Sequence, residues 1–234
     1  MQVFRSDSEG TTGLSVDLAE QVRAKPTGIA AAFAWLKDFA RRKPVAFGGG
    51  VVLVMAIFVA IFAEQIAPHA ATDIGVAGKF LGPGAEGTLL GTDQLGRDIF
   101  SRLIFGARIS MYVGIVSVLI GITFGTLVGV TSAYVGGWAD ILLQRLVDAL
   151  MGFPPIILAL GLMAALGASV NNVVIALVVI LVPGATRVIR SQALSIKELD
   201  YTLAARSIGA SSFRIILRHM LPNVAATYIV LVTL

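Results

Sequence analysis

Long apolar runs alternate with polar, charged segments along most of the chain. Residues 45–63 and 109–135 contain no charged side chain, and neither do the 38 residues from Ala149 to Thr186. A bilayer core roughly 30 Å thick is crossed by about 20 helical residues. The pattern therefore predicts spans at 45–63 and 109–135 and two more spans within 149–186.

Polar residues mark the boundaries in the last part of the chain. The sequence GASVNN at 167–172 is typical of a turn and divides the longest apolar run into two helices. A further apolar run begins near Leu221 and reaches Leu234, about half the length that a span requires. We therefore expect an all-α, polytopic transmembrane helix bundle with four full spans and a truncated fifth.

Basic residues predict the orientation of these spans. Residues 1–44 contain seven Lys and Arg and residues 187–219 contain six, whereas residues 64–108 contain four basic and five acidic residues. Cytoplasmic loops are enriched in Lys and Arg, and four spans separate the two basic segments, so both segments are expected on the cytoplasmic side. The expected organisation is a cytoplasmic N-terminal tail (1–44), a first transmembrane helix (45–63), a periplasmic loop (64–108) and a helical core (109–234). Residues 1–28 lack periodicity and are expected to be disordered or to lie on a surface.

Composition agrees with a membrane protein and excludes several kinds of site. Hydrophobic residues make up 56% of the chain and charged residues 14%, whereas soluble domains average roughly 25% charged residues. The absence of cysteine excludes disulfides, thiolate metal sites and cysteine nucleophiles. His69 and His219 are far apart in sequence, and neither an HExxH nor a GxxxxGK[ST] pattern occurs. We expect no metal, no cofactor and no nucleic-acid partner.

Ionisable side chains are absent from the depth of every predicted span. Ion-driven carriers generally need such groups as relays, which disfavours an ion-coupled secondary transporter. No serine–histidine or paired-carboxylate set falls at depth either, so no catalytic residue is expected. The energy for any transport should come from another polypeptide.

Glycines and prolines predict how the spans pack and bend. Small residues recur at steps of three and four in 109–135 and include Gly114, Gly121, Gly125 and Gly129. Such a face permits close helix contact in lipid, either within this subunit or with a second membrane subunit. Pro154, Pro155 and Pro183 are expected to bend their helices, as a hinge or cavity lining or as a simple adjustment of shape.

The polar segment after the fourth span predicts a helix, a turn and a second helix. Ser195 and Glu198 form a capping-box pattern that indicates a helix start. Gly209 suits the left-handed conformation that ends helices. Ser211 or Ser212 can cap the second helix, FRIILRHML, which Pro222 follows.

The two helices differ in their surfaces. The second helix is expected to have an apolar stripe formed by Phe213, Ile216, Leu217 and Met220, with Arg214 and Arg218 on the other side. In the first helix Ala204 and Ala205 leave room for the close approach of another backbone. Such a pair suits either anionic lipid or a protein groove.

Charged residues at 92–102 predict an interfacial helix that leads into the second span. Thr92 or Asp93 can cap this helix, and Asp93/Arg97 and Asp98/Arg102 stand four residues apart. Contact with an external substrate-delivery protein is the alternative role. Local or membrane-surface pairing is expected at the entrance of the third span for Asp140, Arg145 and Asp148.

The helix–turn–helix segment resembles the cytoplasmic EAA loop of permease subunits in bacterial binding-protein-dependent ABC importers. Ala204, Ala205, Gly209, Leu221 and Pro222 match the spacing of that motif. Leu203 replaces its glutamate and His219 its isoleucine. Residues 90–110, 134–154 and 187–201 are similar to the dipeptide/oligopeptide/nickel branch, so the resemblance covers most of residues 90–223.

The resemblance implies a MetI-like permease subunit, with 109–234 as the permease core and 187–221 as the coupling loop. It would lie in the bacterial inner membrane with a homologous second permease, two cytoplasmic ATPases that bind the ATP, and a periplasmic or lipid-tethered binding protein that delivers peptides. Coupling to the ATPases would run through residues 195–222. The contacts implied are Asp200, Tyr201, Ala204, Ala205, Arg206, Gly209, Arg214, Arg218, Leu221 and Pro222. The alternatives are an ion-coupled secondary transporter and a membrane scaffold whose cytoplasmic loop binds lipid.

Overall fold

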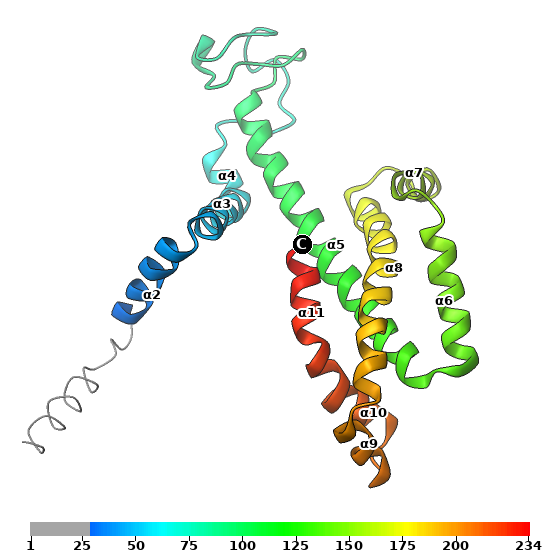
Figure 1. Cartoon of the computed structure of the whole chain (residues 1–234). Coiled ribbons are helices and arrows are strands. Elements are labelled where there is room, and N and C mark those ends of the chain that lie inside the picture. The colour runs from blue at the N-terminus through cyan, green and yellow to red at the C-terminus, as the bar shows by residue number, and fades with distance from the viewer. Residues whose placement is uncertain (1–28) are drawn as a thin grey trace, which may run out of the picture. The chain divides into compact units, whose positions relative to one another are not determined.

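The computed structural model describes residues 29–234 and divides into two compact units, Met1–Phe58 and Val59–Leu234. In the first unit α2 (Ile29–Arg42) is followed by α3 (Pro44–Ile61), which continues to the unit boundary (Figure 1). The expectation for residues 1–28 lies outside the described residues. The predicted tail therefore contains a helix, α2, that the search for long uncharged runs did not reveal because four of its fourteen residues are charged.

The second unit is helical apart from the long segment at 67–98. Its elements are α4 (Ala63–Ile66), η1 (Ala85–Gly87), α5 (Ile99–Val135), α6 (Gly137–Met151), α7 (Pro155–Leu166), α8 (Val170–Lys197), α9 (Asp200–Ser207), α10 (Ser212–Ile215), the π-helical turn η2 (Ile216–Met220) and α11 (Leu221–Thr233). Among residues 29–234, four helices are long and apolar enough to cross a membrane: Pro44–Ile61, Ile99–Val135, Val170–Lys197 and Ser212–Thr233. With the bent pair α6–α7 the number of candidate spans rises to five.

The second span is longer than the sequence predicted. Helix α5 begins at Ile99, ahead of the expected 109, and its 37 residues extend about 55 Å. Its N-cap is Asp98, whose carboxylate accepts hydrogen bonds from the N–H groups of Phe100 and Ser101, so the prediction of Thr92 or Asp93 as cap is wrong. The hydropathy criterion missed the first turns because they contain two arginines, which lower hydropathy without opposing helix formation.

The third span is a bent pair of helices. Helix α6 ends at Met151, α7 starts at Pro155, and the two helices meet at an angle of 93°. Pro154 and Pro155 cannot donate backbone hydrogen bonds, which ends the helix there. The bend predicted for this proline pair is confirmed, whereas α8 continues as one helix through Pro183.

Helix α8 also continues through the predicted start of the coupling helix. Ser195 lies inside α8, which ends at Lys197, and Glu198 is its C-cap. The capping-box prediction is wrong because Ala193 and Ile196 are buried in the core of the second unit, which holds this turn in the helix. The following helix, α9, starts after Leu199 with no side-chain cap.

The predicted second coupling helix is the start of a span. Residues Ser212–Thr233 form one continuous run of helix, in which Pro222 lies in the first turn of α11 and does not end it. Ser211 caps this run by accepting from the Arg214 N–H at 3.4 Å, as predicted. Proline is tolerated in a first helical turn, where its missing N–H costs no helical hydrogen bond.

The π-helical turn changes which side chains are buried. The predicted stripe is wrong at Phe213 and Leu217, which are exposed, whereas Ile215, Met220 and Val224 are buried. Ile215 and Met220 are five residues apart, the spacing that a π turn brings to one face, whereas the prediction assumed an uninterrupted α-helix.

Helices α5 and α8 run in the same direction and pack through glycines. A Cβ built on Gly121 would lie 2.9 Å from Leu181 Cβ, one on Gly125 2.6 Å from Ala185 Cβ, and one on Gly129 2.8 Å from the Thr186 carbonyl oxygen. Gly114 has no atom within 4 Å of such a Cβ. Three of the four predicted glycines therefore lie against α8 of the same chain.

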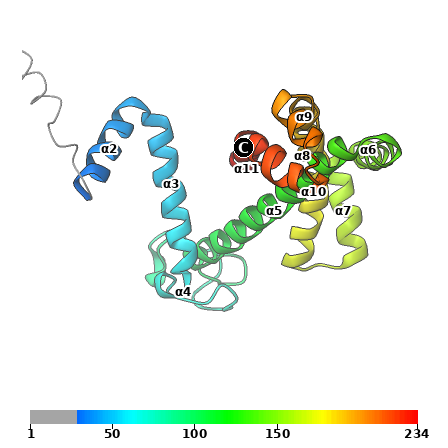
Figure 2. The ribbon, with the colours of Figure 1, turned by 90° about the horizontal axis from the view of Figure 1, so that it is seen from below.

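The core of the second unit lies where α9, α10 and α11 meet the C-terminal ends of α5 and α8 (Figure 2). It consists of Val130, Ala133, Ile189, Ala193, Ile196, Ala205, Ile215, Met220 and Val224. Ala205 of α9 and Ile215 of α10 thus share one apolar cluster with the membrane helices. The short helices therefore pack directly against α5 and α8.

Candidate functional site: the groove between α9 and α10

A tight turn joins α9 to α10. Gly209 has a φ of +82°, as its predicted left-handed role requires. The Gly209 N–H donates to the Arg206 carbonyl at 3.0 Å and the Ala210 N–H to the Ala205 carbonyl at 3.1 Å. This pair of hydrogen bonds is the Schellman motif, which satisfies the last carbonyls of a helix.

A groove of about 540 Å³ opens beside this turn. It is lined by Tyr201, Ala204, Ala205, Ile208, Gly209, Ala210, Arg214, Arg218 and His219. Six of the ten residues implied by the EAA resemblance are among them. Asp200, Arg206, Leu221 and Pro222 lie outside the lining.

Two alanines leave the groove wide, and two arginines give it a positive charge. Ala204 and Ala205 lie on the groove side of α9, where longer side chains would fill the space. Arg214 and Arg218 enter from the α10–η2 segment, and within residues 29–234 neither has an acidic side chain at ion-pair distance. The groove is therefore apolar at its base and positively charged at its edge.

Three residues that line the groove were not among those implied by the sequence. Ile208 is 86% exposed directly before the left-handed glycine, and Ala210 follows that glycine. The His219 ring lies 6.1 Å from the Tyr201 ring, centroid to centroid. From the sequence, His219 was interpreted only as a departure from the motif.

Polar contacts attach α9 to the end of α8. The Thr202 hydroxyl donates to the Ile196 carbonyl at 3.0 Å, and Thr202 is buried. Lys197 donates to the Ala133 carbonyl of α5 at 3.2 Å. These contacts and the apolar core give the groove a fixed place beneath α5 and α8.

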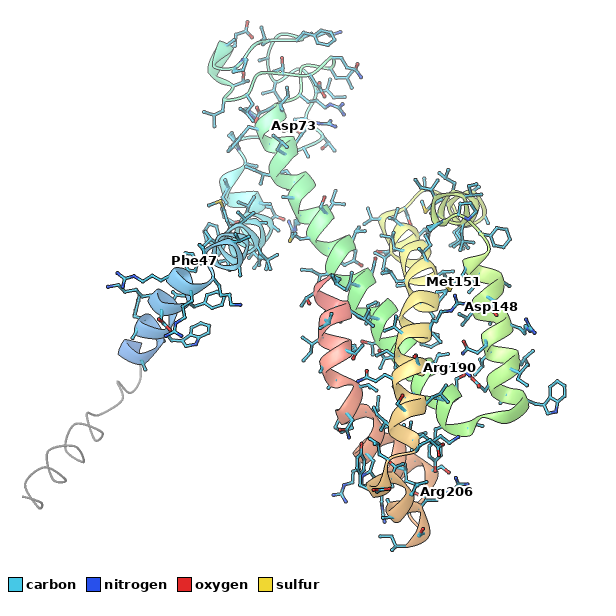
Figure 3. All side chains as sticks on the ribbon, in the orientation of Figure 1. Phe47, Asp73, Asp148, Met151, Arg190 and Arg206 are labelled. Atoms are coloured by element: carbon cyan, nitrogen blue, oxygen red, sulfur yellow. The ribbon has the colours of Figure 1, made fainter. Side chains whose placement is uncertain are left out.

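Two ion pairs connect α6 to α8, and Figure 3 labels one member of each, Arg190 on α8 and Asp148 on α6. Arg190 donates to both carboxylate oxygens of Asp140, at 2.7 and 2.5 Å, and the Ser132 hydroxyl of α5 also donates to Asp140. Arg187 pairs with Asp148. The prediction of local pairing is wrong, because these partners are 50 and 39 residues apart in sequence. Three elements are joined through Asp140, which ties the helix before the bend to the helix that leads into the groove.

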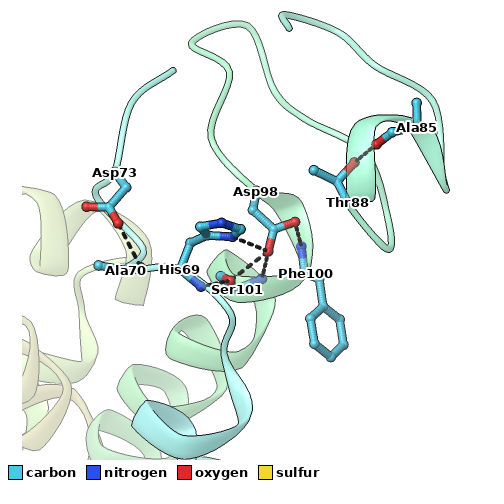
Figure 4. Close-up of polar contacts among 8 residues, drawn as sticks. All are labelled: His69, Ala70, Asp73, Ala85, Thr88, Asp98, Phe100 and Ser101. Atoms are coloured by element: carbon cyan, nitrogen blue, oxygen red, sulfur yellow. Dashed lines mark hydrogen bonds and ion pairs between the residues drawn. The ribbon is translucent and has the colours of Figure 1, made fainter. Parts of the chain in front are cut away.

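A second polar cluster lies at the start of α5 (Figure 4). The Ser101 hydroxyl donates to Asp98 at 2.6 Å, and Ser101 accepts from the His69 N–H at 3.1 Å. The predicted Asp93–Arg97 pair is present at 2.7 Å, but Arg102 lies 3.6 Å from Asp93 and does not pair with Asp98. Asp98 is occupied as the helix cap.

We expect the stability of this cap to depend on pH. Burial alone would raise the pKa of Asp98, but hydrogen bonds from the Ser101 hydroxyl and from the N–H groups of Ser101 and Phe100 hold its pKa below the ordinary 3.8. A carboxylate with a lowered folded pKa stabilises the fold fully above its unfolded pKa, and this contribution is lost as pH falls through the folded pKa. The protection of the Phe100 and Ser101 amides from hydrogen exchange, measured relative to the intrinsic exchange rate at each pH, should therefore fall below about pH 4.

Asp98→Asn provides the control for this prediction. Asparagine keeps an oxygen that can accept from these two amides but has no carboxylate to titrate, so their protection should change little between neutral pH and acid. Equal acid dependence in the variant and the parent chain would contradict the role of Asp98.

Comparison with known proteins agrees with this arrangement. Residues 121–234 match the model of the binding-protein-dependent transport system inner membrane component, and residues 36–83 match the N-terminal transmembrane domain of oligopeptide transport permease C. The chain belongs to this family of transport permeases. The groove of this permease falls entirely within the first matched region, and its α3 within the second.

Relatives of the permease carry related names. It is 37% identical over 202 residues to the dipeptide transport system permease protein of Alkalihalophilus pseudofirmus, covering 86% of this chain and 66% of the relative. It is 37% identical over 189 residues to the glutathione transport system permease protein of Pectobacterium atrosepticum, covering 81% and 63%. It is 40% identical over 185 residues to a putative peptide transport system permease protein of Brucella suis, covering 79% and 62%. The permease thus matches less than two thirds of the length of each relative.

Proposed function

We propose that the chain is a permease subunit of an ATP-driven importer of peptides. Its α5, α8 and α11 would contribute to the transport pathway together with a homologous second permease. ATP would be bound and hydrolysed by two cytoplasmic ATPase subunits, and a periplasmic or lipid-tethered binding protein would deliver the substrate. The family and the names of the relatives support this role.

The groove between α9 and α10 is the observation on which the proposal depends. Its apolar base and unpaired arginines suit an ATPase surface that inserts apolar side chains and surrounds them with acidic ones. The contacts of Ala205 and Ile215 with the core would pass a movement of the ATPases to α5 and α8. In this arrangement the cytoplasmic side would contain the groove, the end of α8 and the start of the chain.

Copurification tests the ATPase partner. A tagged chain, solubilised from its native membrane, should retain an ATPase that mass spectrometry identifies by its nucleotide-binding sequence. Arg214→Glu with Arg218→Glu should reduce the retained ATPase by about tenfold or more, since like charges then face each other across the interface.

The matched control changes two charges outside the groove, Lys79→Glu and Arg145→Glu, and should leave the retained ATPase unchanged. A lipid-binding scaffold predicts no ATPase in any of these preparations. An ion-coupled transporter predicts uptake that survives ATP depletion and stops when the ion gradient is removed.

A further inference from the structure

An apolar groove lies between α2 and α3 in the first unit. It has a volume of about 390 Å³ and is lined by Trp35, Leu36, Phe39, Ala46, Phe47, Gly50, Val51 and Val54. Figure 3 labels Phe47 on the α3 side. The rings of Trp35 and Phe39 stack at 5.3 Å, centroid to centroid, and form the α2 side. The groove is separate from the α9–α10 site and has no part in the proposed function.

The chemistry of the lining selects a hydrocarbon occupant. Every lining residue is apolar, and the surrounding backbone is hydrogen-bonded within the two helices. An extended polypeptide inserted here would find no partners for its own N–H and C=O groups, which are costly to bury unpaired. An acyl chain has no such groups, and Gly50 leaves it space because no atom lies within 4 Å of a Cβ built there.

The charges beside the groove favour a lipid with a negatively charged headgroup. Asp38 is the one acid in residues 29–58, and it pairs with Arg42 at 2.8 Å. Lys37, Arg41 and Lys43 remain as exposed cations around the α2–α3 junction. Clusters of basic residues beside a membrane span attract anionic lipid headgroups.

The apolar groove and the exposed cations lie at the start of a candidate membrane span, where the chain would enter the bilayer. Lys43 directly precedes Pro44, where the spanning helix α3 begins. One face of α2 contains Trp35, Leu36 and Phe39 and the opposite face contains Lys37 and Arg41, the pattern of a helix that lies in the interface. We propose that the α2–α3 groove binds an anionic phospholipid of the bilayer, with an acyl chain against Trp35 and Phe39 and the phosphate at Lys37, Arg41 and Lys43.

Tryptophan quenching by brominated lipid tests this site in the full chain. Trp138→Phe leaves Trp35 as the one tryptophan. The chain is reconstituted in vesicles of equal parts phosphatidylcholine and phosphatidylglycerol, with brominated acyl chains on one lipid or the other. We expect brominated phosphatidylglycerol to quench Trp35 at least about fivefold more strongly, since even one basic residue near the headgroups favours an anionic lipid by roughly that factor.

Two variants separate the headgroup from the acyl chain. Lys37→Gln with Arg41→Gln and Lys43→Gln should abolish the preference for phosphatidylglycerol while quenching by either lipid continues. Gly50→Leu fills the groove and should reduce quenching by both lipids at unchanged charge. The matched control removes three charges elsewhere, Lys79→Gln, Arg145→Gln and Arg206→Gln, and should keep the preference.

Three results would overturn the proposal. Equal quenching by the two brominated lipids would remove the anionic headgroup from the site. Loss of the preference in the matched control would show a general charge effect. Quenching by neither lipid, with Trp35 shielded by a second copy of the chain or by another protein, would make the groove a protein interface.

Discussion

Gly209→Val should reduce peptide uptake by at least about tenfold while the chain still inserts into the membrane. The φ of Gly209 is +82°, and a β-branched side chain in that region costs about 2 kcal/mol. No atom lies within 4 Å of a Cβ built at Gly209, so the backbone conformation causes the effect and crowding does not. Relaxation of the turn would change the angle between α9 and α10. Uptake of a labelled dipeptide and ATP hydrolysis, measured together in proteoliposomes with the partner subunits, should show hydrolysis without transport.

Gly209→Asn is the matched control. Asparagine tolerates the left-handed conformation better than other non-glycine residues, and the position has open space, so most of the uptake should be kept. Normal coupled uptake in Gly209→Val would contradict the role of this turn in coupling. Equal losses in both variants would show that the site needs a glycine for a reason other than φ.

Gly125→Leu should destabilise the helix bundle by about 3 kcal/mol and lower its apparent unfolding temperature in detergent by roughly 10 °C. A Cβ at this position would lie 2.6 Å from Ala185 Cβ and 2.8 Å from the Val182 carbonyl oxygen. The Thr186 hydroxyl also donates to the Gly125 carbonyl at 3.2 Å across the same contact. Because a backbone carbonyl cannot turn aside as a side chain can, α5 and α8 would have to separate.

Gly114→Leu is the internal control, since no atom lies within 4 Å of a Cβ built there. It makes the same chemical change on the same helix and should leave the unfolding temperature nearly unchanged in the isolated chain. Similar melting of the two variants would contradict the close approach of α5 and α8. A loss that appears for Gly114→Leu only in the assembled transporter would place a second subunit against that face.

Structure was predicted well from the sequence where a residue's own backbone or its near neighbours decide the conformation. The long apolar runs predicted membrane spans because hydrophobicity over 20 or so residues decides insertion almost alone. Gly209 was predicted as a left-handed residue because glycine has no Cβ that would clash with the backbone in that conformation. Ser211 was predicted as a cap because its hydroxyl bonds a neighbour three residues away, Arg214.

Predictions failed where the packed structure departs from the local pattern in the sequence. Ser195 and Glu198 have the capping-box pattern, yet burial of Ala193 and Ile196 keeps this turn in α8. The apolar stripe of the second helix shifted because a π turn brings Ile215 and Met220 to the buried face.

The sequence by itself determined the number of apolar segments, the turn at Gly209 and the proline break before α7, since each depends on residues close together in the chain. Only the tertiary structure decided that Asp140 pairs with Arg190, that α5 packs on α8 through three glycines, and that six of the implied coupling residues line one groove. The ion pair and the glycine contacts join segments tens of residues apart, and the groove forms where α9 meets the α10–η2 segment. The free energy that selects these features arises only when the helices are packed together.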